Sequence, residues 1–198
     1  MACKLRVDSK GWYDRGESYT RYFSNDVKVD CPSGRGFNAI KVDQSCQATC
    51  ILRSADVYGN GPSAATKLEN AINSVSVGEY VLVGVADTGK AYDATSQNRI
   101  NRALKSLGAN VGIMNTWRQS YVLLAQKVAS GDSKVALCEK GPQNAPLTCE
   151  ATVHVASSNL QPSTAPTTSP SVKTTAPSVS SSTRPSVSPS ERPSMSPS

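Results

Sequence analysis

The sequence has little of what most catalytic sites require. Its only histidine is His154, so a nucleophile paired with a histidine base has few possible partners. Thr152 and His154 share one face of an alternating strand pattern, which is typical of a surface or packing histidine. Asp87 and Asp93 are candidates for the paired carboxylates of a hydrolase. The simpler interpretation is that one caps the following helix and the other is solvated. We therefore expect no enzyme and no cofactor.

Long apolar runs are also absent. No segment approaches the roughly 18 apolar residues that a membrane-spanning helix needs. The first residues, Met1 to Arg6, lack the apolar segment of a secretion signal. We expect no membrane span in this chain. We interpret the chain as a fragment of a longer secreted protein. The alternative is a cytosolic chain whose cysteines are reduced.

The net charge of +6 is moderate and is spread along the chain, with a basic excess before residue 42. Nucleic-acid binders usually show a denser basic stripe or a recognisable module, and neither is evident. We expect no nucleic-acid partner. The basic side chains are interpreted as solubilising groups on solvated strand faces, and a polyanionic partner is the alternative.

The chain has six cysteines: Cys3, Cys31, Cys46, Cys50, Cys138 and Cys149. Zinc is the competing interpretation, because Cys46 and Cys50 have a tolerable spacing. No second close pair follows, and only one histidine is present, so disulfides are favoured and no metal is expected. Bridges that close local loops would be Cys3–Cys31, Cys46–Cys50 and Cys138–Cys149.

Composition divides the chain near residue 156. Residues 1–156 contain nearly all large apolar side chains and should form one globular domain. Residues 157–198 consist largely of Ser, Thr, Pro, Val and Ala, with prolines at a four-residue period near the end. Such a segment cannot bury enough apolar surface to fold, so it is predicted to be a disordered Pro/Ser/Thr-rich stalk or linker.

The globular part is predicted to be α+β. Short strands are expected at 4–7, 19–23, 26–29, 36–42 and 49–53, with the last two forming a hairpin around Cys46. Apolar residues at helical spacing predict helices at 62–76 and 95–107. The continuous apolar run Tyr80–Ala86 predicts a strand covered on both faces. Further strands are expected at 111–114 and 120–126, and a hairpin of 134–139 with 148–155 would be pinned by Cys138–Cys149.

Four segments in order resemble the interleukin-like EMT inducer and pancreatic-derived factor (ILEI/PANDER) domain family. They are Ser33-Gly-Arg-Gly-Phe-Asn38, Ala55-Asp-Val-Tyr-Gly59, Tyr80-Val-Leu-Val-Gly-Val-Ala-Asp87 and Trp117-Arg-Gln-Ser-Tyr-Val-Leu123. They are also similar to the stem domain of protein O-mannose N-acetylglucosaminyltransferase. The resemblance implies two antiparallel β-sheets flanked by two or three short helices, in secreted or luminal proteins without catalytic activity.

The resemblance also implies a sugar site formed by arginines and an aspartate, which by position are Arg35, Asp87 and Arg118. A carboxylate can accept hydroxyl hydrogen bonds, and guanidinium groups offer fixed donors. Trp117 could present a ring face to a pyranose, although a core position is an equal alternative. A purely structural Asp–Arg ion pair is the other interpretation.

The sequence therefore favours an extracellular, non-catalytic recognition module that binds a glycan or a cell-surface or wall glycoprotein. The alternative is a cytokine-like ligand that contacts a protein receptor.

Overall fold

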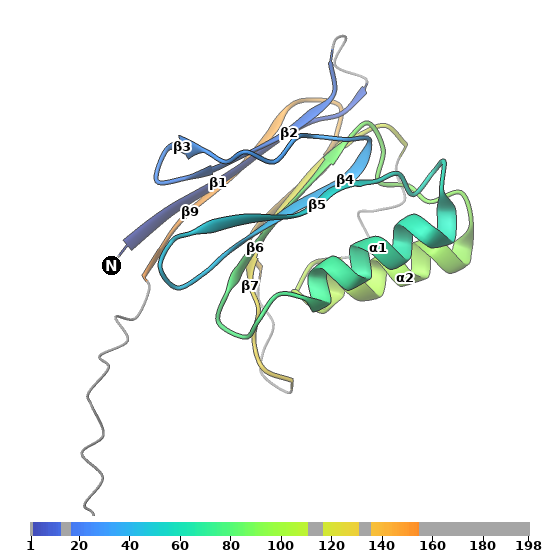
Figure 1. Cartoon of the computed structure of the whole chain (residues 1–198). Helices are drawn as coiled ribbons and strands as arrows, with labels where there is room; N and C mark the ends of the chain where they lie inside the picture. Colours follow the sequence, from blue (N-terminus) through green and yellow to red (C-terminus); the bar gives the residue numbers. More distant parts are fainter. Residues whose placement is uncertain (1, 13–16, 111–116, 131–135, 155–198) are drawn as a thin grey trace, which may run out of the picture. The chain divides into compact units, whose positions relative to one another are not determined.

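Two antiparallel β-sheets stack face to face, and two helices cover the outer face of the larger sheet (Figure 1). The computed structural model describes residues 2–12, 17–110, 117–130 and 136–154. The smaller sheet has the order β3-β2-β1-β9, formed by β1 (Ala2–Lys10), β2 (Tyr19–Ser24), β3 (Val27–Lys28) and β9 (Leu147–His154). The larger has the order β5-β4-β6-β7-β8, formed by β4 (Gly36–Val42), β5 (Ala48–Ala55), β6 (Tyr80–Ala86), β7 (Ser120–Gln126) and β8 (Ala136–Gln143). The helices are α1 (Gly61–Asn73) and α2 (Ala94–Lys105).

Strand β6 lies in the middle of the larger sheet, and all of its residues are buried. Alternate side chains of a strand point to opposite faces. Val81, Val83 and Val85 therefore pack in the core against α1 and α2, while Tyr80 and Leu82 pack in the core between the two sheets. This double burial confirms the prediction made from the unbroken apolar run.

Glycine is required at position 84, where the two sheets approach closely. A Cβ atom there would lie 2.7 Å from Cγ2 of Thr20 in β2, well inside van der Waals contact. The small residue thus allows the smaller sheet to lie across the middle of β6.

The α+β prediction is confirmed in its two antiparallel sheets and its helices. The predicted bounds of β4, β6 and β7 agree with the structure, and α1 and α2 begin within one residue of their predicted starts. The C-terminal hairpin is wrong. Strand β8 pairs with β7, and β9 pairs with β1 of the other sheet, because the chain passes from one sheet to the other between Gln143 and Leu147.

Two of the three predicted disulfides are also wrong. The structure pairs Cys3 with Cys46 and Cys31 with Cys50, at Cα separations of 5.9 and 5.3 Å. Cys3–Cys46 joins β1 to the turn between β4 and β5, and Cys31–Cys50 joins the segment after β3 to β5. Each bridge thus connects residues that are neighbours in space, and not the ends of a local loop as expected. Cys138–Cys149 is as predicted, with a Cα separation of 5.7 Å, but it connects the two sheets rather than a hairpin.

By its internal contacts the chain divides into Met1–Ser158 and Asn159–Ser198. The predicted strand at 111–114 and the predicted stalk at 157–198 lie outside the described residues. In the described part of the chain, neither helix is long and apolar enough to cross a membrane.

Candidate functional site

Three strand ends bring the predicted site residues to one edge of the larger sheet. Arg35 directly precedes β4 and Asp87 directly follows β6, and the register pairs Gly36 with Ala86. Strand β7 is antiparallel to β6 and pairs Tyr121 with Val85, so Trp117 and Arg118 enter the sheet at the same edge. We call this end of the larger sheet, where Arg35, Asp87, Trp117 and Arg118 lie together with the side chains that contact them, the rim.

Arg35 and Asp87 form the ion pair of the rim. Nε of Arg35 lies 2.7 Å from Oδ2 of Asp87. A terminal nitrogen of the same guanidinium lies 3.6 Å from a carboxylate oxygen of Asp56, which directly follows β5. Arg35 is therefore held between two carboxylates, and half of its side chain stays exposed.

Arg118 is placed differently from Arg35. Its guanidinium carbon lies 5.3 Å from the ring centre of Trp117 and 5.7 Å from that of Trp12, so it stacks between two indoles. Its backbone N–H donates to Oγ1 of Thr88 at 3.4 Å. No carboxylate of the described residues pairs with it within 4.0 Å. Its guanidinium donors are thus available to a ligand.

Aromatic rings line the rim beside the arginines. Tyr58 contacts Trp117 edge to face at 4.3 Å between ring centres and Tyr92 at 6.0 Å. Arg35 lies 5.8 Å from the ring of Tyr58. Trp12 and Tyr92 are 53% and 79% exposed, so large apolar surfaces face solvent there. Trp117 itself is half-buried and joins this row rather than the core.

Two backbone features keep the rim in place. Asp87 and Arg118 both have positive φ, +73° and +58°, a region that costs non-glycine residues of the order of 1 kcal/mol. Gly11 allows the neighbouring segments to meet, because a Cβ there would lie 2.6 Å from the carbonyl oxygen of Arg118. Its N–H donates to Oγ of Ser120 at 2.7 Å, which sets Trp12 against Arg118.

One carboxylate oxygen of the rim is left without a donor. Oδ1 of Asp87 is buried and has no hydrogen-bond partner among the described residues. A buried acceptor without a partner costs about 1–3 kcal/mol. Such a group is uncommon in folded proteins, and it marks the rim as a place where a donor from a ligand would be favourable.

Asp93 is the N-cap of α2 rather than part of the rim pair. Its carboxylate accepts from the backbone N–H of Ser96 at 2.8 Å and from the Ser96 hydroxyl at 2.7 Å. These hydrogen bonds lower the pKa of Asp93 below its usual value. The capping interpretation is confirmed for Asp93. The expectation that the other acid is solvated is wrong, because Asp87 is buried and paired with Arg35. Within the described ranges, no group of three potential ligand side chains could hold a metal ion.

A hollow of about 350 Å³ adjoins the Tyr92 end of the rim, between the 90–94 loop and the first turns of α2. Its lining is mixed and includes the polar residues Lys90, Gln97, Asn98 and Asn101 beside Ala91, Tyr92 and Ala94. Gln97 is engaged with the backbone N–H of Ala91 at 3.0 Å.

Sequence reasoning found Arg35, Asp87, Trp117 and Arg118, and the structure brings these four to one edge. It missed Asp56, Tyr58, Trp12 and Tyr92. Asp56 and Tyr58 lie within the Ala55–Gly59 segment that pointed to the family, so a signal for them was present. Trp12 and Tyr92 are isolated aromatic residues, and nothing in the local sequence distinguishes them.

These features define a disulfide-linked α+β domain with aromatic and charged side chains gathered at the rim. Residues 35–129 match the model of the interleukin-like EMT inducer family. The chain therefore contains a domain of that family, and the matched range spans β4 to β7, which supply most of the rim. No curated protein matches the chain.

Proposed function

We propose that this domain is a non-catalytic recognition module of an extracellular protein and that its rim binds carbohydrate. The observation that supports this most strongly is the buried Oδ1 of Asp87, which lacks a donor. Sugar hydroxyls are neutral donors and acceptors, so one hydroxyl can donate to Oδ1 while a neighbouring hydroxyl accepts from a guanidinium.

The aromatic row supports the same proposal. Tyr58, Trp117 and the exposed Trp12 offer apolar ring faces and edges beside charged groups. Pyranose rings have apolar C–H faces and polar edges, and this combination matches a row of rings next to fixed polar groups. The hollow beside Tyr92 would accommodate a further sugar unit.

An extracellular location is supported by the three disulfides, which are typical of oxidising compartments. Residues 157–198 would then act as a Pro/Ser/Thr-rich stalk that displays the domain.

The test is binding of the whole chain to an array of immobilised neutral oligosaccharides, followed by calorimetry on any that bind. Arg118→Gln should lower affinity at least tenfold, because a charged hydrogen bond and a ring-stacking group are lost. Gln faces about the same strain at positive φ as Arg, so the backbone should be unaffected. Arg21→Gln is the matched control, since Arg21 also stacks on a ring, that of Tyr19, at 4.0 Å. Equal binding by wild type and Arg118→Gln would refute the site.

A cytokine-like, protein-binding function is the second candidate. Tyr92 and Trp12 are exposed at the rim, and large exposed aromatic side chains are common anchors of protein interfaces. Binding to a cell-surface protein that survives enzymatic removal of all glycans, yet is lost in Tyr92→Ala, would favour this function over the first.

A further inference from the structure

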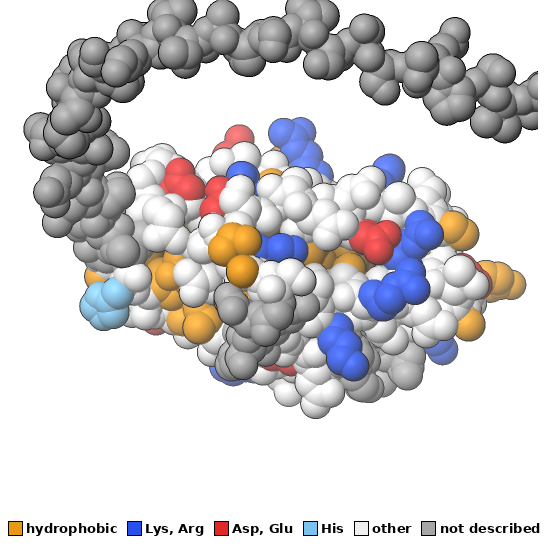
Figure 2. Space-filling view, turned by 90° about the horizontal axis from the view of Figure 1, so that it is seen from below, with side chains coloured by type: hydrophobic (Ala, Val, Ile, Leu, Met, Phe, Trp, Pro, Cys, Tyr) orange, Lys and Arg blue, Asp and Glu red, His pale blue; other side chains and the backbone are white. Residues whose placement is uncertain are grey.

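The helical layer carries a strong excess of positive charge. Helices α1 and α2 contain four basic residues, Lys67, Arg99, Arg102 and Lys105, and one acidic residue, Glu69. Figure 2, which looks at the molecule from below, shows Lys and Arg side chains gathered on the half that holds the helices. The helical layer thus contributes a large part of the net charge of +6.

Arg99 is used within the fold. It lies 3.5 Å from the Glu69 carboxylate and donates a hydrogen bond to the Thr66 hydroxyl, and these contacts tie α2 to α1. The remaining cations of the layer are exposed, as is Arg53 on the adjacent strand β5. We call Arg53, Lys67, Arg102 and Lys105 the basic band. None of the four has a carboxylate partner within 4.0 Å in the described part of the chain.

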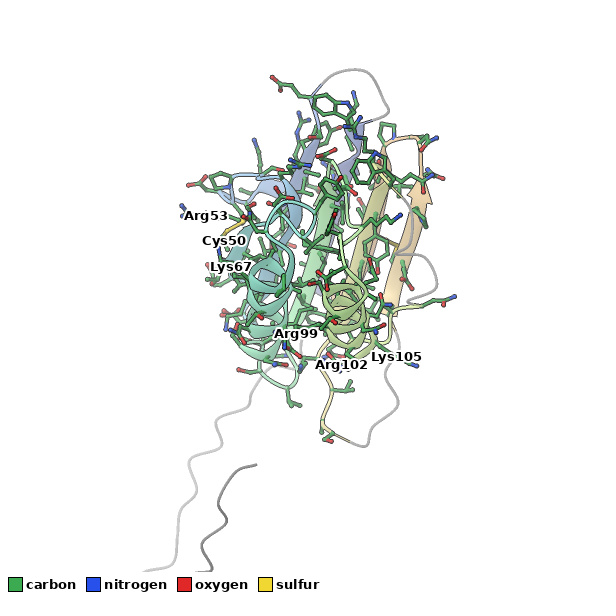
Figure 3. The ribbon with its side chains drawn as sticks, turned by 90° about the vertical axis from the view of Figure 1, so that its right-hand side faces the viewer. Cys50, Arg53, Lys67, Arg99, Arg102 and Lys105 are labelled. Atoms are coloured by element: carbon green, nitrogen blue, oxygen red, sulfur yellow. A yellow bond between two sulfur atoms is a disulfide. The ribbon has the colours of Figure 1, made fainter. Side chains whose placement is uncertain are left out.

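The band extends across three neighbouring elements. Helix α1 packs against β5 on one side and against α2 on the other. Figure 3 shows Arg53 and Lys67 on one side of the helical layer, Arg102 and Lys105 on the other, and Arg99 between them. At the α2 end, Arg102 and Lys105 line a hollow of about 550 Å³ together with Ser106, Gly108 and Ala109. The cations therefore follow a line with a depression at one end.

Stabilisation of the helix ends explains only two of the four cations. Arg102 and Lys105 lie in the last turn of α2, where cations interact favourably with the helix dipole. Lys67 lies in the middle of α1 and Arg53 in a strand, so the dipole accounts for neither. Unpaired like charges on one face repel each other, which is a cost that an anionic partner would remove.

We propose that the basic band binds an acidic polysaccharide, a linear chain bearing sulfate or carboxylate groups. A line of separated cations matches a polymer with regularly spaced anions better than it matches a compact ligand. The guanidinium group of arginine and the ammonium group of lysine both bind sulfate and carboxylate oxygens. The disulfides indicate an oxidising compartment, where such polymers occur. No aromatic side chain belongs to the band, whereas single-stranded nucleic acids are usually held by stacking on aromatic rings. The basic band and the rim share no residue, and this proposal does not depend on the function proposed for the rim.

The test uses the whole chain, with its disulfides intact, and heparin fragments as the sulfated probe. At about 0.1 M salt, where the screening length is about 10 Å, the variant Arg102→Gln/Lys105→Gln should lower affinity by about 25-fold, at roughly fivefold for each cation removed. The dependence of log affinity on log salt concentration should also become shallower, because fewer counterions are released on binding.

The matched control is Lys28→Gln/Lys140→Gln, which removes the same charge from exposed positions of β3 and β8. It should change affinity by less than threefold, because exposed charges far from the contact are screened. Equal weakening in both double variants would mean that only net charge matters and would overturn the proposal. Unchanged binding in the first variant, or tighter binding of single-stranded DNA than of heparin, would also overturn it.

The variant Arg102→Gln/Lys105→Gln should lose only the helix-dipole contribution of about 0.3–1 kcal/mol for each cation. Its circular dichroism spectrum at the assay temperature should match that of wild type and exclude misfolding as the cause. A variant at the rim, Asp87→Asn, should bind heparin like wild type, which separates failure of this proposal from failure of the proposed function.

Discussion

Replacing Asp87 with Asn distinguishes a binding residue from a structural one. The side chain of Asp87 is 12% exposed, and its partner Arg35 is 45% exposed. Asn is the informative substitution because it tolerates positive φ, and Asp87 has a φ of +73°. Ala at this position would add backbone strain of about 1 kcal/mol and would confuse the result.

Two opposing effects decide the stability of Asp87→Asn. The ion pair with Arg35 is weakened, which costs about 0.5–1 kcal/mol, because half of the Arg35 side chain is in solvent and screened. At the same time the buried Oδ1, which has no donor among the described residues, no longer belongs to a charged group. The amide nitrogen that takes the place of Oδ1 also lacks a partner, so the relief is only the lower cost of burying a neutral group, and it offsets the weakened ion pair in part. We therefore expect the free energy of unfolding to stay within about 1 kcal/mol of wild type.

The assay is urea and thermal unfolding with the disulfides intact, combined with binding to whichever oligosaccharide the wild type recognises. The expected result is a melting temperature within about 4 °C of wild type and at least a tenfold loss of affinity. A loss of more than about 2 kcal/mol in unfolding free energy would refute the reasoning, because it would show that Asp87 serves mainly to hold the strand ends together. Unchanged stability together with unchanged binding would refute the role in recognition.

Other predictions follow from the fold. Gly84→Val should lower the free energy of unfolding by about 1–3 kcal/mol, because its Cβ would lie 2.7 Å from Thr20, and a normal melting temperature would contradict the close approach of the sheets. Non-reducing peptide mapping should recover Cys3–Cys46, Cys31–Cys50 and Cys138–Cys149, and any Cys3–Cys31 peptide would count against this fold. Removing Cys3–Cys46, which joins residues 43 apart, should cost about 4 kcal/mol, against about 3 kcal/mol for Cys138–Cys149, with a separation of 11. The lowered pKa of Asp93 means that its stabilising effect is complete above the unfolded pKa and is lost as pH falls through the folded one. Asp93→Asn should therefore flatten the decline of stability below about pH 4, and an unchanged acid profile would contradict its role as a cap.

The most buried strands were predictable because their signals are local. Tyr80–Ala86 is apolar at every position, since both faces of β6 are covered, and such a run allows few alternatives. The helices were found from apolar residues at helical spacing, and the Asp93 cap from its place before α2. Arg35, Asp87 and Arg118 were named because the family resemblance implies a sugar site at their positions, and each directly adjoins or closely precedes a strand of the larger sheet.

The disulfide pairs and the composition of the rim depended on tertiary structure. Cys3 meets Cys46 because one sheet lies across the other, and sequence separation contains no information about that crossing. Tyr58, Tyr92 and Trp12 come from three different loops and meet where the register of β4, β6 and β7 aligns the strand ends. The sequence by itself determined which segments are strands, which are helices and which strand ends bear charged groups. Only the packing of the two sheets decided which groups touch, because contacts between distant segments depend on how the strands pair and stack, and each segment's own residues do not specify that pairing.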